Sequence, residues 1–254
     1  MDCHALHSDL RSKGIRSDIA MTSLENTPAL ALAKRLRRRL YRPIWESRFP
    51  YYSYMNRNRC VFVHIPKNGG TSIRRALGAS AKGRTHLPWS VYEEANPKKF
   101  SRYFKFAFLR DPTSRLHSAY HYLCAGGNGA DWDLEVAEDI AQYPDFDTFV
   151  AEGLPRRLYR DKLLLYPQTY FVCDNRGHIK VDFLGRMETF DRDARYVFSK
   201  LGLKQHIGRE NTTAASTSGT TIAPATRERI AAFYADDYAL IDQIDNSTAR
   251  GDVN

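Results

Sequence analysis

The sequence predicts an α/β fold, a single domain with a central, mainly parallel β-sheet flanked by helices. Two apolar runs, CVFVHI at 60–65 and FKFAFL at 104–109, have the composition of buried strands, and a helix signal follows each of them. Strands that alternate with helices along a chain form parallel sheets. The chain of 254 residues, 43% of them hydrophobic, is long enough to bury a conventional core.

Residues 1–58 are expected to form an N-terminal extension with a basic helix and an aromatic connector. Thr27 and Pro28 start a helix over 27–42, in which leucines recur every fourth residue and lysines and arginines cover the remaining surface. This helix can lie on an anionic membrane surface, or it can pack its leucines against the domain. The aromatic-rich segment 43–58 then leads into the domain.

The domain itself is predicted over 59–245. After the first strand, a glycine-bearing loop leads into a helix over about 71–79. After the second strand, Asp111 has the position of a helix cap and Pro112 that of the first helical residue. This strand–loop–helix order occurs twice and resembles the arrangement of phosphate-loop domains.

The second half of the domain has weaker signals. Prolines interrupt helical patterns, and glycine with asparagine marks turns. The expected elements are helical pieces over 134–165, a hairpin or two short strands around Asn175–Gly177, a helix over 189–201, a Ser/Thr/Gly-rich loop over 211–221, a helix from Pro224 to about Asp242, and a C-terminal tail over 246–254.

Charge and cysteine content limit the classes of partner. The net charge of +9 and the pI of about 9.4 favour an anionic partner, but no nucleic-acid-binding motif is present, so we expect no nucleic acid. No run of 18 apolar residues and no signal-peptide core occur. The four cysteines form no CxxC pair and no zinc pattern, which favours a reducing compartment and no metal.

The stretch PKNGGTS directly after the first strand has the residues of an anion-binding loop. A strand that turns into a helix presents backbone N–H groups, and glycines allow close approach. The loop offers charge, hydroxyl and backbone donors from Lys67, Asn68, Gly69, Gly70, Thr71 and Ser72. In the triphosphate loop GxxxxGK[ST] the lysine follows the glycines, whereas here Lys67 precedes them. A purely structural turn is the alternative.

A second stretch, RDPTSRLHSAY, follows the second strand. Arg110 comes just after the carboxyl end of that strand, where parallel α/β sheets bind ligands. Ser118 lies two helical turns into the next helix. These two side chains can bind a second phosphate, although Arg110 can equally pair with a carboxylate while Ser118 only packs.

Together the two stretches resemble the sulfotransferases that use 3′-phosphoadenosine 5′-phosphosulfate, and among them the carbohydrate sulfotransferases. Their usual pattern is PKTGGTS followed by R-[DN]-P-x-x-R-x-x-S-x-Y. The similarity continues through YPQTYF, VDFLGRMETFDRD, ENTTAAS and YADDYALI, and so covers about 60–241. Asn68 replaces the more usual threonine and can still donate a hydrogen bond.

The resemblance implies roles for these residues. The loop from Lys67 to Ser72 would bind the 5′-phosphosulfate, while Arg110 and Ser118 would bind the 3′-phosphate. A sulfuryl group then moves in line to an acceptor hydroxyl and leaves adenosine 3′,5′-bisphosphate, and Lys67 neutralises charge on the bridging oxygen. Positioning and charge stabilisation carry such a transfer, and no metal is needed.

A base is needed to take the proton of the acceptor hydroxyl. His86, in GRTHLPWS, matches a histidine of related carbohydrate sulfotransferases, and Glu93 and Glu94 are reserve candidates. His64 is expected to be structural. His117 and His121 are four residues apart on one helix face and, without a third partner nearby, are expected to pack or face solvent.

Further positions have weaker support. Gln168 is expected to contact the acceptor sugar, and the loop over 211–221 to close over the nucleotide with Ser216 or Thr217 near the adenosine. Arg186 and Glu188 are expected to brace the nucleotide side of the sheet.

The acceptor is expected to be a carbohydrate, such as an anionic polysaccharide or a lipid-linked glycan. Two other functions stay open: a phosphate-loop kinase of unusual order, which would need a magnesium-binding carboxylate, and a nucleotide-binding module without catalysis. Animal members of this family usually carry an N-terminal membrane anchor, and none is seen here. We therefore expect a cytoplasmic enzyme of bacterial type, with the helix over 27–42 as a route to peripheral membrane association.

Overall fold

The computed structural model describes residues 49–80, 86–129, 131–160, 162–204 and 222–249. The helix expected over 27–42 and the loop expected over 211–221 lie outside these residues. Within them, no helix combines the length and the apolar composition that a bilayer crossing requires.

A parallel sheet of three strands forms the centre of the domain, in the order β1 (Cys60–Phe62), β2 (Phe104–Leu109) and β3 (Phe183–Arg186). Cys60 pairs with Phe104, and further along β2 Phe106 pairs with Phe183. The expected α/β class with a parallel sheet is therefore confirmed. β1 is shorter than the predicted strand over 60–65, because the chain leaves the ladder after the Val63 amide donates to Phe106 O (2.9 Å).

The strands are buried on both faces, as their apolar runs predict. Lys105 is a charged residue buried in the otherwise apolar strand β2. A lysine is seldom buried without partners. The Lys105 Nζ lies 2.8 Å from an Asp182 carboxylate oxygen and also donates to Phe100 O and Tyr103 O. These acceptors offset the cost of removing the ammonium from water.

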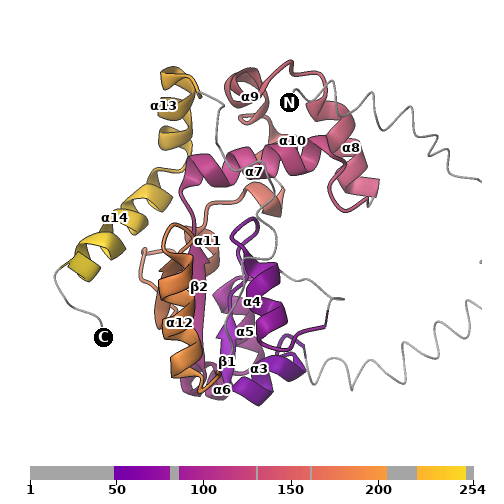
Figure 1. The fold of residues 1–254 in the computed structure, drawn as a ribbon. Coiled ribbons are helices and arrows are strands. Elements are labelled where there is room, and N and C mark those ends of the chain that lie inside the picture. Colours follow the sequence, from indigo (N-terminus) through magenta and orange to yellow (C-terminus); the bar gives the residue numbers. More distant parts are fainter. Residues whose placement is uncertain (1–48, 81–85, 130, 161, 205–221, 250–254) are drawn as a thin grey trace, which may run out of the picture.

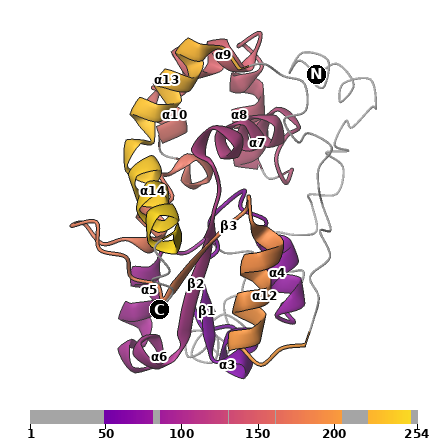
Figure 2. The ribbon, with the colours of Figure 1, turned by 60° about the vertical axis from the view of Figure 1, so that its left-hand side comes forward.

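Helices cover both faces of the sheet. Figure 2 shows α4 (Gly70–Ala76) and α12 (Phe190–Lys200) on one side of the strands, and α5 (Trp89–Ala95) and α6 (Pro97–Arg102) on the other. The buried residues of this layer form one continuous core with the strands.

A second, helical layer lies beyond the carboxyl ends of the strands (Figure 1), and β2 runs directly into it. Its buried residues form a separate core, in which Tyr120, Phe149 and Tyr159 pack together. The elements of this layer are α7 (Pro112–Cys124), α8 (Asp131–Ile140), α9 (Phe146–Thr148), η1 (Phe149–Gly153), α10 (Arg157–Arg160), η2 (Leu163–Leu165) and α13 (Pro224–Phe233).

The cap predicted for α7 is confirmed. The Asp111 carboxylate accepts a hydrogen bond from the Ser114 amide (2.7 Å), and Pro112 occupies the first turn. The helix therefore starts immediately beyond β2, and this connection joins the sheet to the helical layer.

Two segments, one before β1 and one before Asn175, differ from the sequence prediction. Part of the expected aromatic connector is α3 (Ser53–Asn58), whose Tyr54 and Met55 are buried in the core. The expected strand before Asn175 is α11 (Thr169–Val172), so the hairpin is reduced to one antiparallel bridge between Cys173 and Ile179.

The last predicted helix is two helices. Tyr234 leaves helical geometry between α13 and α14 (Ala235–Ala249), and α14 continues beyond the predicted end of the domain at 245. The buried Tyr234 donates its hydroxyl to Leu165 O (2.8 Å), and this long-range contact is invisible in the local helical pattern.

Candidate functional site

The phosphate loop, residues 66–72, connects the extended chain after β1 to α4. Lys67 and Gly69 have positive φ angles of 66° and 65°, a conformation that glycine adopts readily. A Cβ on Gly70 would overlap the His64 ring, and one on Gly69 would come within 2.7 Å of the Met187 methyl carbon. Gly70 is therefore required by the fold, whereas Gly69 is favoured by its positive φ, because the flexible end of Met187 can move. Both glycines leave the backbone N–H groups at the start of α4 without side chains in front of an approaching anion.

The polar side chains of the loop lie on the same short segment. Thr71 and Ser72 are half-buried in the first turn of α4. The Lys67 ammonium lies 4.2 Å from the centre of the Tyr122 ring on α7, within the range of a cation–π contact. A positive charge is thereby held between the loop and the helical layer.

Asn68 has a different role from the one expected. Its side chain is buried, and Nδ2 donates to Phe108 O and to Gln168 Oε1, both at 2.7 Å. Since both amide hydrogens are used inside the protein, the side chain has none left to donate to a phosphate. Any contact of Asn68 with a donor nucleotide would therefore come from its main chain.

Gln168 also differs from expectation. It is 0% exposed, so it does not reach an acceptor sugar in this structure. Its Oε1 accepts from Asn68 Nδ2 and from the Arg110 amide (3.0 Å), while its Nε2 donates to Arg110 O (2.8 Å). Gln168 thus joins the loop after β1 to the loop after β2.

A buried carboxylate holds Gln168 in turn. The two Asp237 carboxylate oxygens accept from the Gln168 and Thr169 amides, both at 2.9 Å. Burial raises the pKa of Asp237, and these amide hydrogen bonds oppose that shift. The first turns of α14 are thereby tied to the two loops.

Arg110 lies beside the phosphate loop, as its position after β2 predicts. Its guanidinium donates to Lys67 O (3.3 Å), and burial lowers its pKa, although an arginine stays charged at neutral pH. Glu188 accepts from the Asp111 amide (2.8 Å) and from Arg186 Nε (3.0 Å), which is the bracing role expected for Arg186 and Glu188. Ser118 lies half-buried on α7, two turns beyond the start of the helix.

Arg115, the second arginine of RDPTSR, is 1% exposed and acts on main-chain groups. It donates to Pro66 O (3.2 Å), to Leu164 O (3.1 Å) and to Tyr166 O (2.8 Å). One guanidinium therefore fixes the phosphate loop and the segment before Gln168 at the same time.

His86 is positioned beside the same loop. Its Nδ1 lies 2.9 Å from His64 O, and the two rings are 4.2 Å apart. A carbonyl oxygen only accepts, so Nδ1 carries the hydrogen of this pair and Nε2 is the nitrogen with basic character. That tautomer suits a base. His64 is buried beside Gly70, in agreement with its expected structural role.

The reserve bases are less well placed. Glu93 on α5 lies near Tyr51, where its charge contributes to raising the pKa of that tyrosine, behind the larger effect of burial. Tyr51 comes just before α3, which lies at the opposite end of the sheet from the phosphate loop (Figure 1). Glu94 is exposed on the same helix. His86 is therefore the stronger candidate.

The His117–His121 pair packs within the helical layer. Their Nε2 atoms are 3.0 Å apart, and the His117 ring packs edge-on against Phe146. Burial, with smaller contributions from His121 and Arg110, lowers the pKa of His117 to about 4. The described part of the chain contains no group of three or more His, Cys, Asp or Glu side chains that could bind a metal.

Ser216 and Thr217, expected near the adenosine, lie outside the described residues. Three residues of the site, Tyr122, Arg115 and Asp237, were not predicted from the sequence. Arg115 and Asp237 stand in the quoted stretches RDPTSRLHSAY and YADDYALI, but the bonds of Asp237 to the Gln168 and Thr169 amides, and the contact of Tyr122 with Lys67, arise only through tertiary packing.

Comparison with known proteins identifies the family of the chain. One curated relative, carbohydrate sulfotransferase 14 of Danio rerio, is 26% identical over 180 residues, which is 59% of this chain and 48% of the relative. The match thus spans about half the length of that relative. No solved structure matches the chain significantly. The model of the sulfotransferase family matches residues 50–242, which include both loops and the sheet. The chain therefore belongs to the sulfotransferase family.

Proposed function

We propose that this protein transfers a sulfuryl group from 3′-phosphoadenosine 5′-phosphosulfate to a hydroxyl of a carbohydrate. The observation that carries the proposal is the convergence of the phosphate loop and Arg110 at one edge of the sheet, joined through Gln168. Two anion-binding elements at fixed separation suit a nucleotide with phosphates at both ends. Family membership and the match to a carbohydrate sulfotransferase support the same reaction.

The residues present fit that donor. The glycine pair gives an anion access to the backbone, Thr71 and Ser72 provide hydroxyl donors, and Lys67 provides a mobile charge. Arg110, with Ser118 further along α7, would bind the 3′-phosphate. A phosphate-loop kinase needs a carboxylate that binds magnesium. The loop over 66–72 contains no Asp or Glu, so a kinase is the weaker alternative.

The chemistry would proceed by in-line displacement. The bond between sulfur and the bridging oxygen breaks, the acceptor oxygen bonds to sulfur, and the hydroxyl proton passes to His86 Nε2. Lys67 stabilises the negative charge that develops on the leaving phosphate, and its release from the Tyr122 ring costs little because that contact is weak. The hydrogen bond from His86 Nδ1 to His64 O stabilises the protonated imidazole.

One assay tests the proposal. Donor labelled in its sulfate is offered with a panel of glycans, and label transfer is followed in the parent protein and in Lys67→Ala. We expect transfer to at least one glycan and a loss of about 100-fold or more in Lys67→Ala. Lys200→Ala is the matched control, because the Lys200 ammonium also lies over a tyrosine ring, 5.7 Å from Tyr196, but on α12.

Three outcomes decide among the functions. Absence of nucleotide binding would refute the proposal. Tight binding of adenosine 3′,5′-bisphosphate without turnover on any acceptor would favour a nucleotide-binding module. Magnesium-dependent consumption of ATP would favour the kinase.

A further inference from the structure

A small open pocket of about 390 Å³ lies at the end of the domain opposite the phosphate loop. α3 and α6 form it, and they lead into the amino ends of β1 and β2, whereas the phosphate loop follows the carboxyl end of β1 (Figure 1). The Phe104 amide donates to Arg59 O (3.1 Å) and joins the two sides. The lining residues are Asn56, Arg59, Lys98, Lys99, Arg102 and Tyr103.

The lining of this pocket carries four cations and no carboxylate. Lys98 and Arg102 are exposed and four residues apart on α6, so they share one face of the helix. Among the described residues, none of the four cations forms an ion pair. Glu93 does not line the pocket, and Asp182, at the same end of the sheet, is paired with Lys105. Like charges this close repel one another, and an anion between them relieves that repulsion.

The donors of the pocket are held in place by the protein itself. Asn56 Oδ1 accepts from Lys99 Nζ and from the Tyr103 hydroxyl, both at 3.0 Å, while Asn56 Nδ2 donates to Tyr51 O (2.9 Å). The Lys99 ammonium also lies 5.3 Å from the centre of the Tyr51 ring. Arg59 has a φ angle of 48°, which a residue other than glycine seldom adopts. The site is therefore built before any ligand arrives.

An exposed aromatic side chain comes just before the pocket in the chain. Phe49 is 42% exposed and precedes Tyr51 by two residues. The sequence over 27–42, which leads to this end of the domain, is rich in lysine and arginine. Aromatic rings next to basic residues are typical of protein surfaces that lie at a membrane–water interface.

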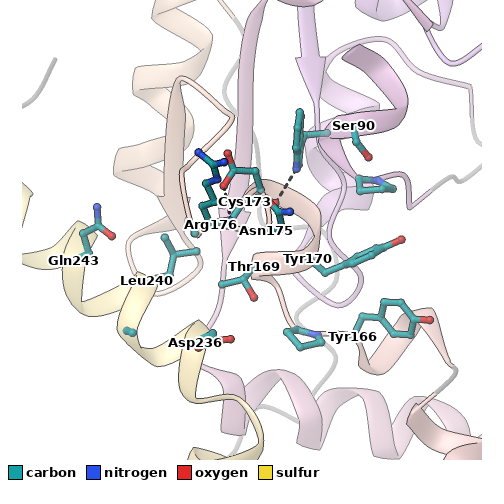
Figure 3. A pocket seen from close by; sticks show the side chains of 16 residues that line it. Ser90, Tyr166, Thr169, Tyr170, Cys173, Asn175, Arg176, Asp236, Leu240 and Gln243 are labelled. Atoms are coloured by element: carbon teal, nitrogen blue, oxygen red, sulfur yellow. Dashed lines mark hydrogen bonds between the residues drawn. The ribbon is translucent and has the colours of Figure 1, made fainter. Parts of the chain in front are cut away.

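The larger open cleft, of about 960 Å³ between α5, α11 and α14, has a different character (Figure 3). Tyr166 and Tyr170 line it together with Asp174 and Asp236, while Arg176 is the cation among its lining residues. Two carboxylates repel an anionic ligand. Of these two cavities, the pocket at α3 and α6 is therefore the one that suits an anion.

We propose that this pocket binds the phosphate group of an anionic phospholipid headgroup, so that the α3–α6 end of the domain faces a lipid surface. Cations that surround a concave site contact several oxygens of one terminal phosphate, and the charge of an anionic bilayer attracts them. A soluble phosphomonoester has the same chemistry, but the exposed Phe49 favours the lipid, because an apolar ring is stabilised at the interface. The donor nucleotide site stays at the opposite end of the sheet. The inference does not depend on the transferase reaction.

Vesicle sedimentation with the full chain tests the proposal. The vesicles are phosphatidylcholine with and without phosphatidic acid, whose headgroup is a terminal phosphate. We expect binding that requires phosphatidic acid. Lys98→Ala combined with Arg102→Ala should lower the partition coefficient roughly ten- to thirtyfold, because each basic residue contributes separately near an anionic surface. Phe49→Ala should lower it roughly threefold.

A matched control separates the pocket from net charge. Arg227→Ala combined with Arg229→Ala removes the same charge from exposed positions on α13, at the other end of the molecule (Figure 1). Binding should then stay within about twofold, since screening weakens charges far from the lipid. Equal losses in the two double variants would overturn the pocket. Equal binding to phosphatidylserine vesicles of the same surface potential would overturn the recognition of a terminal phosphate.

Two further outcomes concern the source of the phosphate. Glycerol 3-phosphate is titrated into the protein by calorimetry as the soluble form of the headgroup. Its binding at the pocket without any binding to vesicles would overturn the lipid assignment. Binding of a phosphoserine peptide without binding to vesicles would assign the pocket to a protein partner and would also overturn it.

Discussion

The phosphate loop with Arg110, here called the donor edge, is built differently from the open cleft that Trp89, Tyr166, Tyr170 and Leu240 line between α5, α11 and α14. At the donor edge, Asn68, Arg115 and Gln168 are buried and bond mainly to main-chain groups, so the backbone is fixed and ready for an anion. In the cleft, side chains such as Tyr170 and Asn175 reach solvent. Changes at the donor edge should therefore cost stability as well as function, whereas changes in the cleft should have little effect on stability.

The largest expected effect concerns His86, the proposed base, which is bonded to His64 O just before the phosphate loop. Replacing His86 with Ala removes the proposed base and should lower turnover by about 10²–10⁴-fold. Affinity for adenosine 3′,5′-bisphosphate should stay within about twofold, as measured by calorimetry. His178→Ala, an exposed histidine in the turn after α11, is the control. Unchanged turnover in His86→Ala would remove this residue from the mechanism.

Arg115 tests how strongly the donor edge depends on buried bonds. Arg115→Leu should lower the free energy of unfolding by about 3 kcal/mol or more, because three main-chain carbonyls, one of them in a fully buried contact, lose their donor. Urea denaturation measures the loss. Arg115→Lys keeps the positive charge but not the forked guanidinium donors, and it should lower the free energy of unfolding less. Equal stability of the parent and Arg115→Leu would show that these contacts do not support the loop.

The His117–His121 pair, which packs behind the donor edge, predicts a pH dependence. The pKa of His117 in the folded protein is about 4, against 6.5 for the ordinary side chain, so the unfolded chain binds more protons between these values. Stability is therefore fully present above pH 6.5 and falls as the pH drops toward 4, by about 3 kcal/mol at most.

Urea denaturation at pH 7 and pH 4.5 measures this dependence. His117→Gln should reduce the difference between the two values, while His178→Gln should preserve it. The same difference in both variants would assign the acid sensitivity to other groups.

Gln168 tests the link between the two loops of the donor edge. Gln168→Leu has a similar volume but removes one of the two acceptors of Asn68 Nδ2 and leaves both Arg110 main-chain groups without their Gln168 partner, at a cost of about 2 kcal/mol. Binding of adenosine 3′,5′-bisphosphate should weaken more than that of adenosine 5′-phosphosulfate, which lacks the 3′-phosphate. The exposed Gln142→Leu is the matched control. An equal loss of affinity for both nucleotides would mean that Gln168 supports the fold without coupling the two loops.

The smallest effect on stability is expected in the cleft. Asn175→Ala changes an exposed turn residue and should alter the free energy of unfolding by less than about 0.5 kcal/mol. A loss comparable to that of Gln168→Leu would show that the cleft is as tightly built as the donor edge, and the contrast between the two regions would not hold.

Local signals were sufficient for much of the donor edge. The glycine pair, Asp111 with Pro112, and the two buried strands each follow from residues close together in sequence, and the structure has them where the patterns predict. The local patterns failed at α11 and at Tyr234. A buried partner far along the chain decides the conformation there, through the Asp237 carboxylate and Leu165 O.

By itself the sequence determined the α/β class, the anion loop and the residue types that carry its charge, because backbone geometry and hydrophobic patterning are local properties. Only the tertiary structure decided that Asn68 and Gln168 face inward rather than toward ligands, and that Tyr166, Asn175 and Asp236 share one cleft. The physical reason is that burial and the sharing of hydrogen bonds depend on which distant segments pack together, and residue spacing does not encode that packing.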